Sequence, residues 1–369
     1  NRLDDEYFRL DNCVEKINFY FQDKKIEELS VNACGALLSY LEETQKVNLT
    51  HIRKIEIYQI EEYMSLDVST RRHLELTETM RDKTRKGSLI WVMDKTVTSM
   101  GGRTLRKWLE QPLIRVADIH ERLDAVSELK DKYMVRMETR EHLKKVYDIE
   151  RLMSKIIIGN VNCRDLISLR DSIRQIPPIK NLLMNCNTRL NAKNYQGLDT
   201  LEDIYDLIEK SIIDDPPVTV KEGGIIKSEF NEELAKLRQA ATNGKKWIAE
   251  LEAKEREKTG IKNLKVGFNK VFGYYIEVTK SNYSLVPDTY IRKQTLANCE
   301  RYITQELKEL EDTILNAEEK SVELEYRIFL EIKDEIASQV ERIKNTASCL
   351  AEIDVICSLA ELADRENYC

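Results

Sequence analysis

Two long stretches of the chain carry apolar residues at alternating spacings of four and three, which is the pattern of a coiled-coil seam. The first ascends from about 228 to 257, and the second descends from about 303. The second could cover ~40 residues, or ~60 Å at the rise of an α-helix. We therefore expect an antiparallel helix pair. Its predicted seam residues are Phe230, Leu234, Leu237, Ala241, Ile248 and Leu251 in the first helix and Ile303, Leu307, Leu310, Ile314, Ala317, Leu324 and Ile328 in the second.

The segment between these two helices has a different pattern. Residues 264–268 and 274–278 are rich in β-branched and aromatic side chains, as strands are. Gly267 and Gly273 would be tolerated at a bulge or a turn. A third extended piece is expected at 290–296. The pattern predicts a small β-sheet at the tip of the helix pair.

The remainder of the chain is predicted to be helical, so the fold class is mainly α. A strand-like or irregular segment is expected at 89–93, and Asp118 is a candidate N-cap. Pro177-Pro178 would separate two helices, because proline breaks the helical hydrogen-bond pattern. The predicted helices cover 26–40, 64–80, 100–109, 118–129, 143–158, 164–176, 198–208 and 347–363. Buried faces are predicted at Leu29, Ala33, Ala36, Leu37 and Tyr40 in the first of them and at Ile119, Leu123, Val126 and Leu129 in the fourth.

The composition also favours helices. Of 369 residues only 12 are Gly and 6 are Pro, while 42% are hydrophobic and 33% are charged. No apolar run approaches the ~20 residues that span a bilayer, and the N-terminus has no signal-peptide pattern, so we expect no membrane association. The 8 cysteines form no C-x-x-C pair and the 4 histidines lack metal-ligand spacing. We therefore expect reduced thiols in a cytosolic protein and no metal site.

The charge of the chain is unevenly distributed. The net charge is −7, which alone argues weakly against nucleic acid as a partner. Residues 254–302, however, contain ten basic and five acidic side chains, which gives this segment +5 and leaves −12 for the rest. A polyanion should therefore be repelled everywhere except at the strand-rich segment, so that binding would be oriented.

The basic segment contains candidate ligands for a phosphate backbone. Such binding needs hydrogen-bond donors on a surface and no sequence code. The alternative is that these residues are ordinary solvated charges on an exposed tip. Tyr274 and Tyr275 could stack on bases, but strand alternation favours packing of at least one of them against the sheet's own core. The candidate backbone-binding residues are Lys258, Lys262, Lys265, Lys270, Arg292, Lys293 and Asn298.

The sequence contains no phosphate-binding loop and no nucleophile motif of a hydrolase. The Gly101-Gly102 and Gly223-Gly224 pairs lack the Gly-Lys of a phosphate-binding loop, and no G-x-S-x-G occurs. Phe230 begins an F-x-E triplet of a kind that could wedge a base step, but its place in the seam predicts a core residue. We expect this chain to have no enzymatic activity and no cofactor of its own.

Several segments resemble the MutS family of DNA mismatch repair proteins. LKVGFNKVFGYYIEVTKS and YIRKQTLANCERYITQELKELEDTIL resemble the family's clamp and the lever helix that returns from it. Upstream, SLDVSTRRHLEL, SLIWVMDKTVTSMGGRTLRKWLEQPLI and IHERLDAVSEL are similar to its core, or lever, domain. LAEIDVICSLAELA resembles the helix that leads into its ATPase domain. These motifs follow the family's order along the chain.

The resemblance implies a domain organisation. The end of a connector region would occupy 1–25, a discontinuous helical lever domain 26–228 and 303–369, and a β-rich clamp domain 229–302. The family's mismatch-reading domain would precede this chain. Its ATPase domain, which uses ATP and Mg²⁺, would follow. This chain alone would then neither hydrolyse ATP nor discriminate a mismatch.

The resemblance also implies partners and contacts. Double-stranded DNA would be gripped by paired clamps, which requires a MutS-like second subunit, and MutL is a further candidate partner. The location would be the cytoplasm, at the bacterial nucleoid, or the nucleus of a eukaryote. Family clamp contacts match Lys258, Lys262, Lys293 and Asn298, whereas the other candidates rest on charge alone. The alternative function is a coiled-coil interaction or scaffold module that docks a repair partner.

Overall fold

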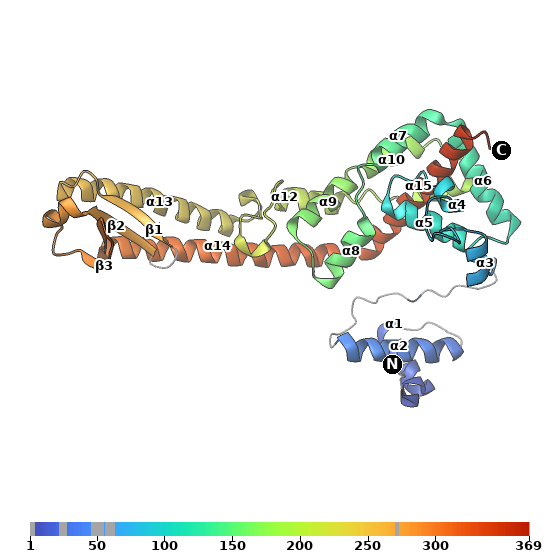
Figure 1. Cartoon of the computed structure of the whole chain (residues 1–369), viewed down its shortest axis with the longest axis horizontal. Coiled ribbons are helices and arrows are strands. Elements are labelled where there is room, and N and C mark those ends of the chain that lie inside the picture. The colour runs from blue at the N-terminus through green and yellow to red at the C-terminus, as the bar shows by residue number, and fades with distance from the viewer. Residues whose placement is uncertain (1–3, 22–27, 46–54, 56–62, 270–272, 369) are drawn as a thin grey trace. The chain divides into compact units, whose positions relative to one another are not determined.

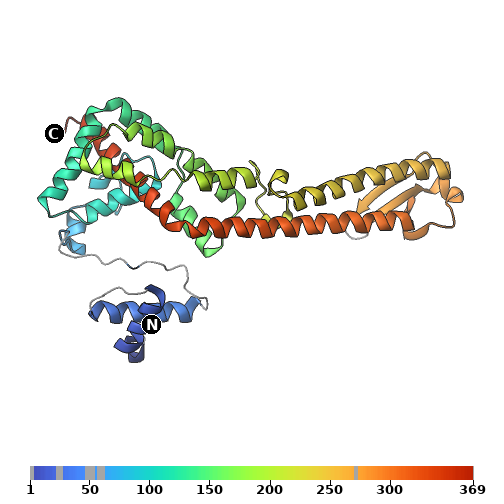
Figure 2. The ribbon, with the colours of Figure 1, turned by 180° about the vertical axis from the view of Figure 1, so that it is seen from behind.

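The chain forms two compact units, which Figure 1 and Figure 2 show from opposite sides. The first contains Asn1–Asn160, Pro177–Asp199 and Lys344–Cys369, and the second contains Val161–Ile176 and Thr200–Ile343. The computed structural model describes residues 4–21, 28–45, 55, 63–269 and 273–368.

Two helices near the N-terminus of the first unit pack on each other, α1 (Leu10–Phe21) and α2 (Glu28–Gln45). The helix predicted at 26–40 is confirmed over its described part, which excludes 26, 27 and the side chain of Leu29. Its predicted face is confirmed at Ala36 but wrong at Ala33 and Leu37, whose side chains are exposed, because a different stripe of α2 faces α1. The buried contact is formed by Cys13, Ile17, Val31 and Leu38.

Helix α3 (Val68–His73) is much shorter than the helix predicted at 64–80. Asp67 caps its start by accepting the N–H of Thr70 at 2.6 Å. The chain leaves the helix soon afterwards, because Glu75 has a left-handed backbone conformation with φ of 48°. The predicted helix is therefore wrong at both ends.

Helix α4 (Leu89–Met93) corrects the strand-like segment predicted there. A helix start leaves backbone N–H groups without partners inside the helix. Here the N–H of Leu89 donates to the carbonyl of Glu75 at 3.0 Å, and that of Ile90 donates to the carbonyl of Leu76 at 2.9 Å. These partners, distant in sequence, stabilise a helix too short to be seen in the pattern.

The other helices of the first unit agree partly with the predictions. The helices at 100–109 and 118–129 are confirmed, but Asp118 is not an N-cap: it lies in the first turn and pairs with Arg115 at 3.0 Å. The predicted buried face is wrong at Ile119 and Leu123, which are exposed, whereas Leu129 is buried as predicted. The sequence pattern did not predict the helices at 133–143 and 189–197. The helices of this group are α5 (Ser99–Glu110), α6 (Val116–Asp131), α7 (Tyr133–Leu143), α8 (Ile149–Ile158), α11 (Arg189–Gly197) and α15 (Val340–Arg365), which continues from the second unit.

The proline pair at 177–178 does not separate two helices as predicted. It lies in the first turn of α10 (Ile176–Leu183). Proline is tolerated there because the N–H groups of a first turn have no partner within the helix. The breaker assignment is therefore corrected.

The second unit is dominated by two long helices, α13 (Glu232–Thr259) and α14 (Gln305–Ser338). Both views show them side by side, with the sheet at the end where α13 stops and α14 starts (Figure 1, Figure 2). The predicted seam is confirmed at most positions, but Phe230 is 37% exposed in a short 3₁₀ turn, and Ile303 ends a strand. The buried seam residues include Leu234, Ala241, Ile248, Leu251, Leu307, Ile314, Ala317, Leu324 and Ile328. The shorter helices of this unit are α9 (Cys163–Ile173) and α12 (Glu202–Ser211).

Gly244 lies where the two long helices come into close contact. A Cβ atom there would lie 2.3 Å from Cγ1 of Ile314. In an exposed helix G244A would stabilise by about 1 kcal/mol, but here we expect it to destabilise by about 1–3 kcal/mol through overpacking. Urea unfolding followed by far-UV circular dichroism measures the difference. T242A, at an exposed position on the same helix, is the control and should stabilise by about 0.5 kcal/mol. A stabilising G244A would contradict the close contact.

A four-stranded antiparallel sheet occupies the end of the helix pair. The strands are β1 (Lys265–Asn269), β2 (Gly273–Thr279), β3 (Ile291–Thr295) and β4 (Cys299–Ile303), in the order β1-β2-β4-β3. Their buried side chains form one apolar cluster with the helices, which includes Ile276, Val278, Tyr302, Leu251 and Leu307. Three strands were predicted, and β4 was missed.

The predicted fold class is confirmed: the chain is mainly α, with a long helix pair that carries a small β-rich end. Within the described ranges, every helix is too short or too polar to serve as a transmembrane span. The predicted domain boundaries stay a prediction.

Candidate nucleic-acid interface

The candidate backbone-binding residues that the structure describes lie at the sheet end of the second unit (Figure 1). We call residues 254–306 the tip. Lys265 lies on β1, whereas Arg292 and Lys293 lie on β3, and the strand order places these two strands at opposite edges of the sheet. Three strand spacings separate the edges, which amounts to about 14 Å. The tip therefore offers two separate groups of cations, which would have to meet different phosphates.

The first group lies where helix α13 turns into strand β1. Gly260 ends the helix with φ of 70°, the left-handed conformation that glycine adopts without strain. Lys262 follows in the turn and Lys265 opens the strand. Both side chains are exposed, and neither takes part in an ion pair among the described contacts. Their charge is thus available to a ligand.

The second group lies around strand β3. The pairing register with β4 shifts between Arg292 and Gln294, so that Lys293 sits at a bulge, where a side chain can be re-aimed. Lys293 and Asn298 are exposed. The carbonyl of Asn298 accepts the N–H of Lys280 at 3.2 Å, which brings a further exposed lysine to this group. Charge was the only sequence signal for Lys280, which was not among the predicted residues.

Two of the candidates are ion-paired within the tip. Nζ of Lys258 lies 3.6 Å from a carboxylate oxygen of Glu255, and Nη1 of Arg292 lies 3.2 Å from one of Glu300. Their side chains remain 58% and 63% exposed. They can still reach a phosphate, but that phosphate must compete with a carboxylate.

Hydrogen bonding sets the ionisation of one of these carboxylates. The hydroxyl of Tyr302 donates to Glu300, and this bond, with the nearby guanidinium of Arg292, lowers the pKa of the Glu300 carboxyl. Burial and the same bond raise the pKa of Tyr302 to about 12. At neutral pH the glutamate is therefore ionised, and the tyrosine remains a donor.

One arginine of the sheet, Arg301, is engaged by neighbouring side chains of the sheet. Arg301 lies over the ring of Tyr275 at 4.1 Å and bonds Gln294 at 3.0 Å and Glu277 at 3.4 Å. The tyrosine ring itself covers Gly267, where an added Cβ would lie 2.8 Å from it. Arg301 contributes to the charge of the segment, but its guanidinium is engaged by the sheet.

Of the two adjacent tyrosines in β2, at least one was predicted to pack against the core of the sheet. Tyr274 packs against the apolar cluster of the tip, with its ring 4.8 Å from that of Phe268, so the prediction that one tyrosine of the pair faces inward is confirmed. Lys270 lies outside the described residues.

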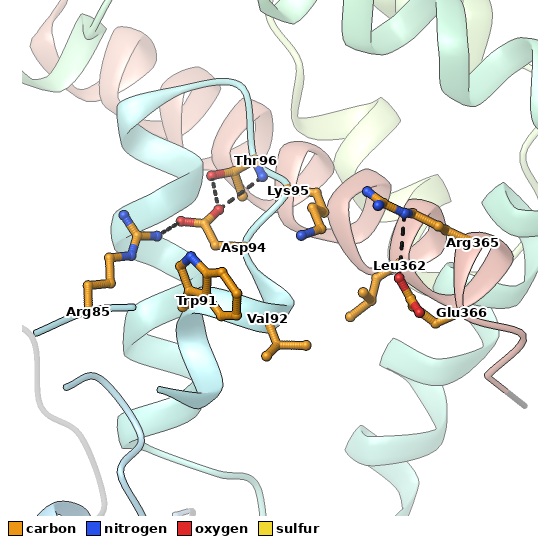
Figure 3. Close-up of a pocket in the computed structure, with 9 residues that line it drawn as sticks. All are labelled: Arg85, Trp91, Val92, Asp94, Lys95, Thr96, Leu362, Arg365 and Glu366. Atoms are coloured by element: carbon orange, nitrogen blue, oxygen red, sulfur yellow. Dashed lines mark hydrogen bonds and ion pairs between the residues drawn. The ribbon is translucent and has the colours of Figure 1, made fainter. Parts of the chain in front are cut away.

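The first unit has a surface pocket of 620 Å³, shown in Figure 3. Its lining comes from segment 85–96 and the end of α15. Asp94 pairs with Arg85 and accepts hydrogen bonds from Thr96, while Arg365 pairs with Glu366 at 3.5 Å. In both ion pairs the carboxylate and the guanidinium neutralise each other's charge. Among the described residues, no group of three or more His, Cys, Asp or Glu is placed to hold a metal ion.

The class of protein is thus mainly α-helical, with a long antiparallel helix pair that carries a small sheet with cations at both edges. Residues 69–360 match the family model described as MutS domain III. The chain belongs to the MutS family, which confirms the resemblance seen in the sequence.

Relatives from several bacteria agree with this assignment. The chain is 64% identical over 370 residues to the DNA mismatch repair protein MutS of Acetivibrio thermocellus, covering 99% of this chain and 42% of that protein. It is 64% identical over 366 residues to the DNA mismatch repair protein MutS of Ruminiclostridium cellulolyticum, covering 98% of this chain and 42% of that protein. It is 54% identical over 355 residues to the DNA mismatch repair protein MutS of Alkaliphilus oremlandii, covering 96% of this chain and 40% of that protein. The chain thus spans about two fifths of the length of these relatives.

Proposed function

We propose that the tip binds the backbone of duplex DNA without reading its sequence. The observation that carries this proposal is the set of exposed cations at both edges of the sheet, on a chain whose net charge is −7. Lys262 and Lys265 supply one edge, and Lys293 supplies the other. Phosphate contacts need only such donors. The relatives' names favour DNA over other polyanions.

Charge reversal at both edges, K262E together with K293E, should weaken binding to a random-sequence duplex. Each phosphate contact contributes about −0.9 to the slope of log affinity against log salt, so loss of two contacts should flatten that slope by about 1.8. The measurement is fluorescence anisotropy of a labelled duplex, titrated with the 369-residue chain at several salt concentrations.

The matched control is K236E together with K246E. Both lysines are exposed on α13, away from the sheet, and the change in net charge is the same. The control should lower affinity only slightly, through long-range repulsion, and leave the slope unchanged. Equal losses in the two double variants, or no loss in either, would reject the tip as the contact surface.

We propose further, from family membership, that the long helices couple DNA binding at the tip to an ATPase domain outside this chain. ATP and Mg²⁺ would be bound there. A MutS-like second subunit would complete the grip on DNA, MutL is a candidate partner, and the cytoplasm would be the location. The continuity of α14, 34 residues in one helix, supports such coupling, because displacement of one end of a continuous helix can displace the other.

A further inference from the structure

Two glutamates inside the tip are each hydrogen-bonded to a tyrosine. Glu255 of α13 is 2% exposed and accepts the hydroxyl of Tyr290 on Oε2 at 2.5 Å. Glu300 of β4 is 8% exposed and accepts the hydroxyl of Tyr302 on Oε2. A buried carboxylate requires such donors, because removal from water without them strongly destabilises its charge.

The second oxygen of each carboxylate faces a surface cation. Oε1 of Glu255 lies 3.6 Å from Nζ of Lys258, and Oε1 of Glu300 lies 3.2 Å from Nη1 of Arg292. Both cations are more than half exposed, so each is held from the protein side and open toward solvent. Each carboxylate thus bridges a tyrosine inside the tip and a cation on its surface.

The two bridges meet inside the tip. The rings of Tyr290 and Tyr302 lie 5.9 Å apart at an angle of 61°, and each residue is 7% exposed. Such an edge-to-face contact fixes the two rings relative to each other. One chain of contacts therefore runs from the end of α13 to the edge strand β3. Its members are Lys258, Glu255, Tyr290, Tyr302, Glu300 and Arg292.

We infer that Tyr290 and Tyr302 are positioning residues for DNA binding, which hold Lys258 and Arg292 in place through the buried carboxylates. The inference rests on the proposed function and names residues that would act behind its contact surface. A hydroxyl that fixes a carboxylate also fixes the cation paired with it. A cation held in place loses less side-chain entropy when it meets a phosphate, and so binds it more tightly.

The sign of the expected effect follows from this geometry. Loss of either hydroxyl frees the carboxylate and with it the paired cation, so it should weaken DNA binding.

A double-mutant cycle tests the inference. Y290F removes one hydroxyl and should weaken binding to a random-sequence duplex about fivefold, the effect of freeing one long side chain. In a K258M chain, which lacks the cation, Y290F should cause no further loss. Y302F should behave in the same way with R292M. A purely structural role would give the same loss in both backgrounds, because effects through independent causes add.

Y326F is the matched control. Tyr326 is exposed on α14, outside the tip, and among the described hydrogen bonds none involves its hydroxyl. Its loss of a hydroxyl should leave DNA affinity unchanged. Urea unfolding followed by Trp247 fluorescence, in chains that also carry W91F and W108F, shows whether each phenylalanine variant folds. If Y290F does not fold, the cycle of Y302F with R292M decides by itself.

The outcomes separate the inference from the proposed function. Equal weakening by Y290F in the wild-type and K258M chains overturns the inference, as does unchanged binding by both K258M and R292M. If K262E with K293E has no effect, the proposed function fails as a whole. If that pair weakens binding while neither phenylalanine variant does, only the positioning role fails.

Discussion

Replacement of Asp354 by alanine should lower the free energy of unfolding of the first unit by about 3 kcal/mol. Asp354 lies on α15 with no solvent exposure. Its carboxylate accepts the N–H of Val97 at 3.0 Å, the N–H of Thr98 at 2.8 Å and the Thr98 hydroxyl at 2.7 Å. Thr98 is the N-cap of α5. Alanine would leave these donors without an acceptor at the start of a core helix.

The tryptophans allow this loss to be measured in one unit. Trp91 and Trp108 lie in the first unit and Trp247 lies in the second, so W247F gives a chain whose fluorescence reports on the first unit alone. Urea unfolding of this chain, with and without D354A, gives the difference. E138A, which removes an exposed carboxylate from α7, should change stability by less than about 0.5 kcal/mol. If D354A changed the free energy of unfolding as little as E138A does, the proposed role of the Asp354 hydrogen bonds would be contradicted.

The effect of Asp354 should also depend on pH. Burial raises the pKa of its carboxyl above the ordinary value, despite the hydrogen bonds from Thr98 and Val97. Its protonated form is therefore favoured more in the folded than in the unfolded chain. The resulting stabilisation is complete below the unfolded pKa of about 3.9 and is lost as pH rises through the higher folded pKa. The difference between wild type and D354A should shrink over that interval.

The long helices could be predicted because their signal is local. Buried positions such as Leu234 and Leu307 recur at the spacing that a helix requires, whatever lies around them. Strand β4 could not, because CERYI adjoins the seam of α14 and becomes a strand only by pairing with β2 and β3. Helix α4 depends in the same way on carbonyls of Glu75 and Leu76.

The candidate site shows the same division between local and distant information. Clustered charge identified Lys262 and Lys293, which the structure leaves exposed. The pairing of Lys258 with Glu255 could be inferred from a spacing of three on a helix. That of Arg292 with Glu300 depends on the register of β3 against β4, including the bulge, which no sequence pattern specifies.

In the second unit the largest loss of stability is expected from E325A, about 3 kcal/mol. Glu325 of α14 is 2% exposed. One carboxylate oxygen accepts the N–H groups of Ile225 and Ile226 at 2.6 and 3.2 Å, and the other pairs with Arg238 of α13 at 2.8 Å. One side chain thus joins both long helices to the segment that precedes α13. Alanine would leave two buried N–H groups without acceptors and would remove the carboxylate that pairs with Arg238, which among the described contacts would keep only its hydrogen bond to the Ser228 hydroxyl.

Trp247 reports on this loss in a chain that carries W91F and W108F, since it is then the remaining tryptophan and lies on α13. The control is E323A, an exposed glutamate two residues away on the same helix, for which a change below about 0.5 kcal/mol is expected. E325Q separates the two roles of the carboxylate. An amide oxygen can still accept the N–H groups of Ile225 and Ile226 but cannot pair with the arginine, so its loss should fall between those of E323A and E325A. A loss from E325Q as large as that from E325A would assign the whole effect to the ion pair with Arg238.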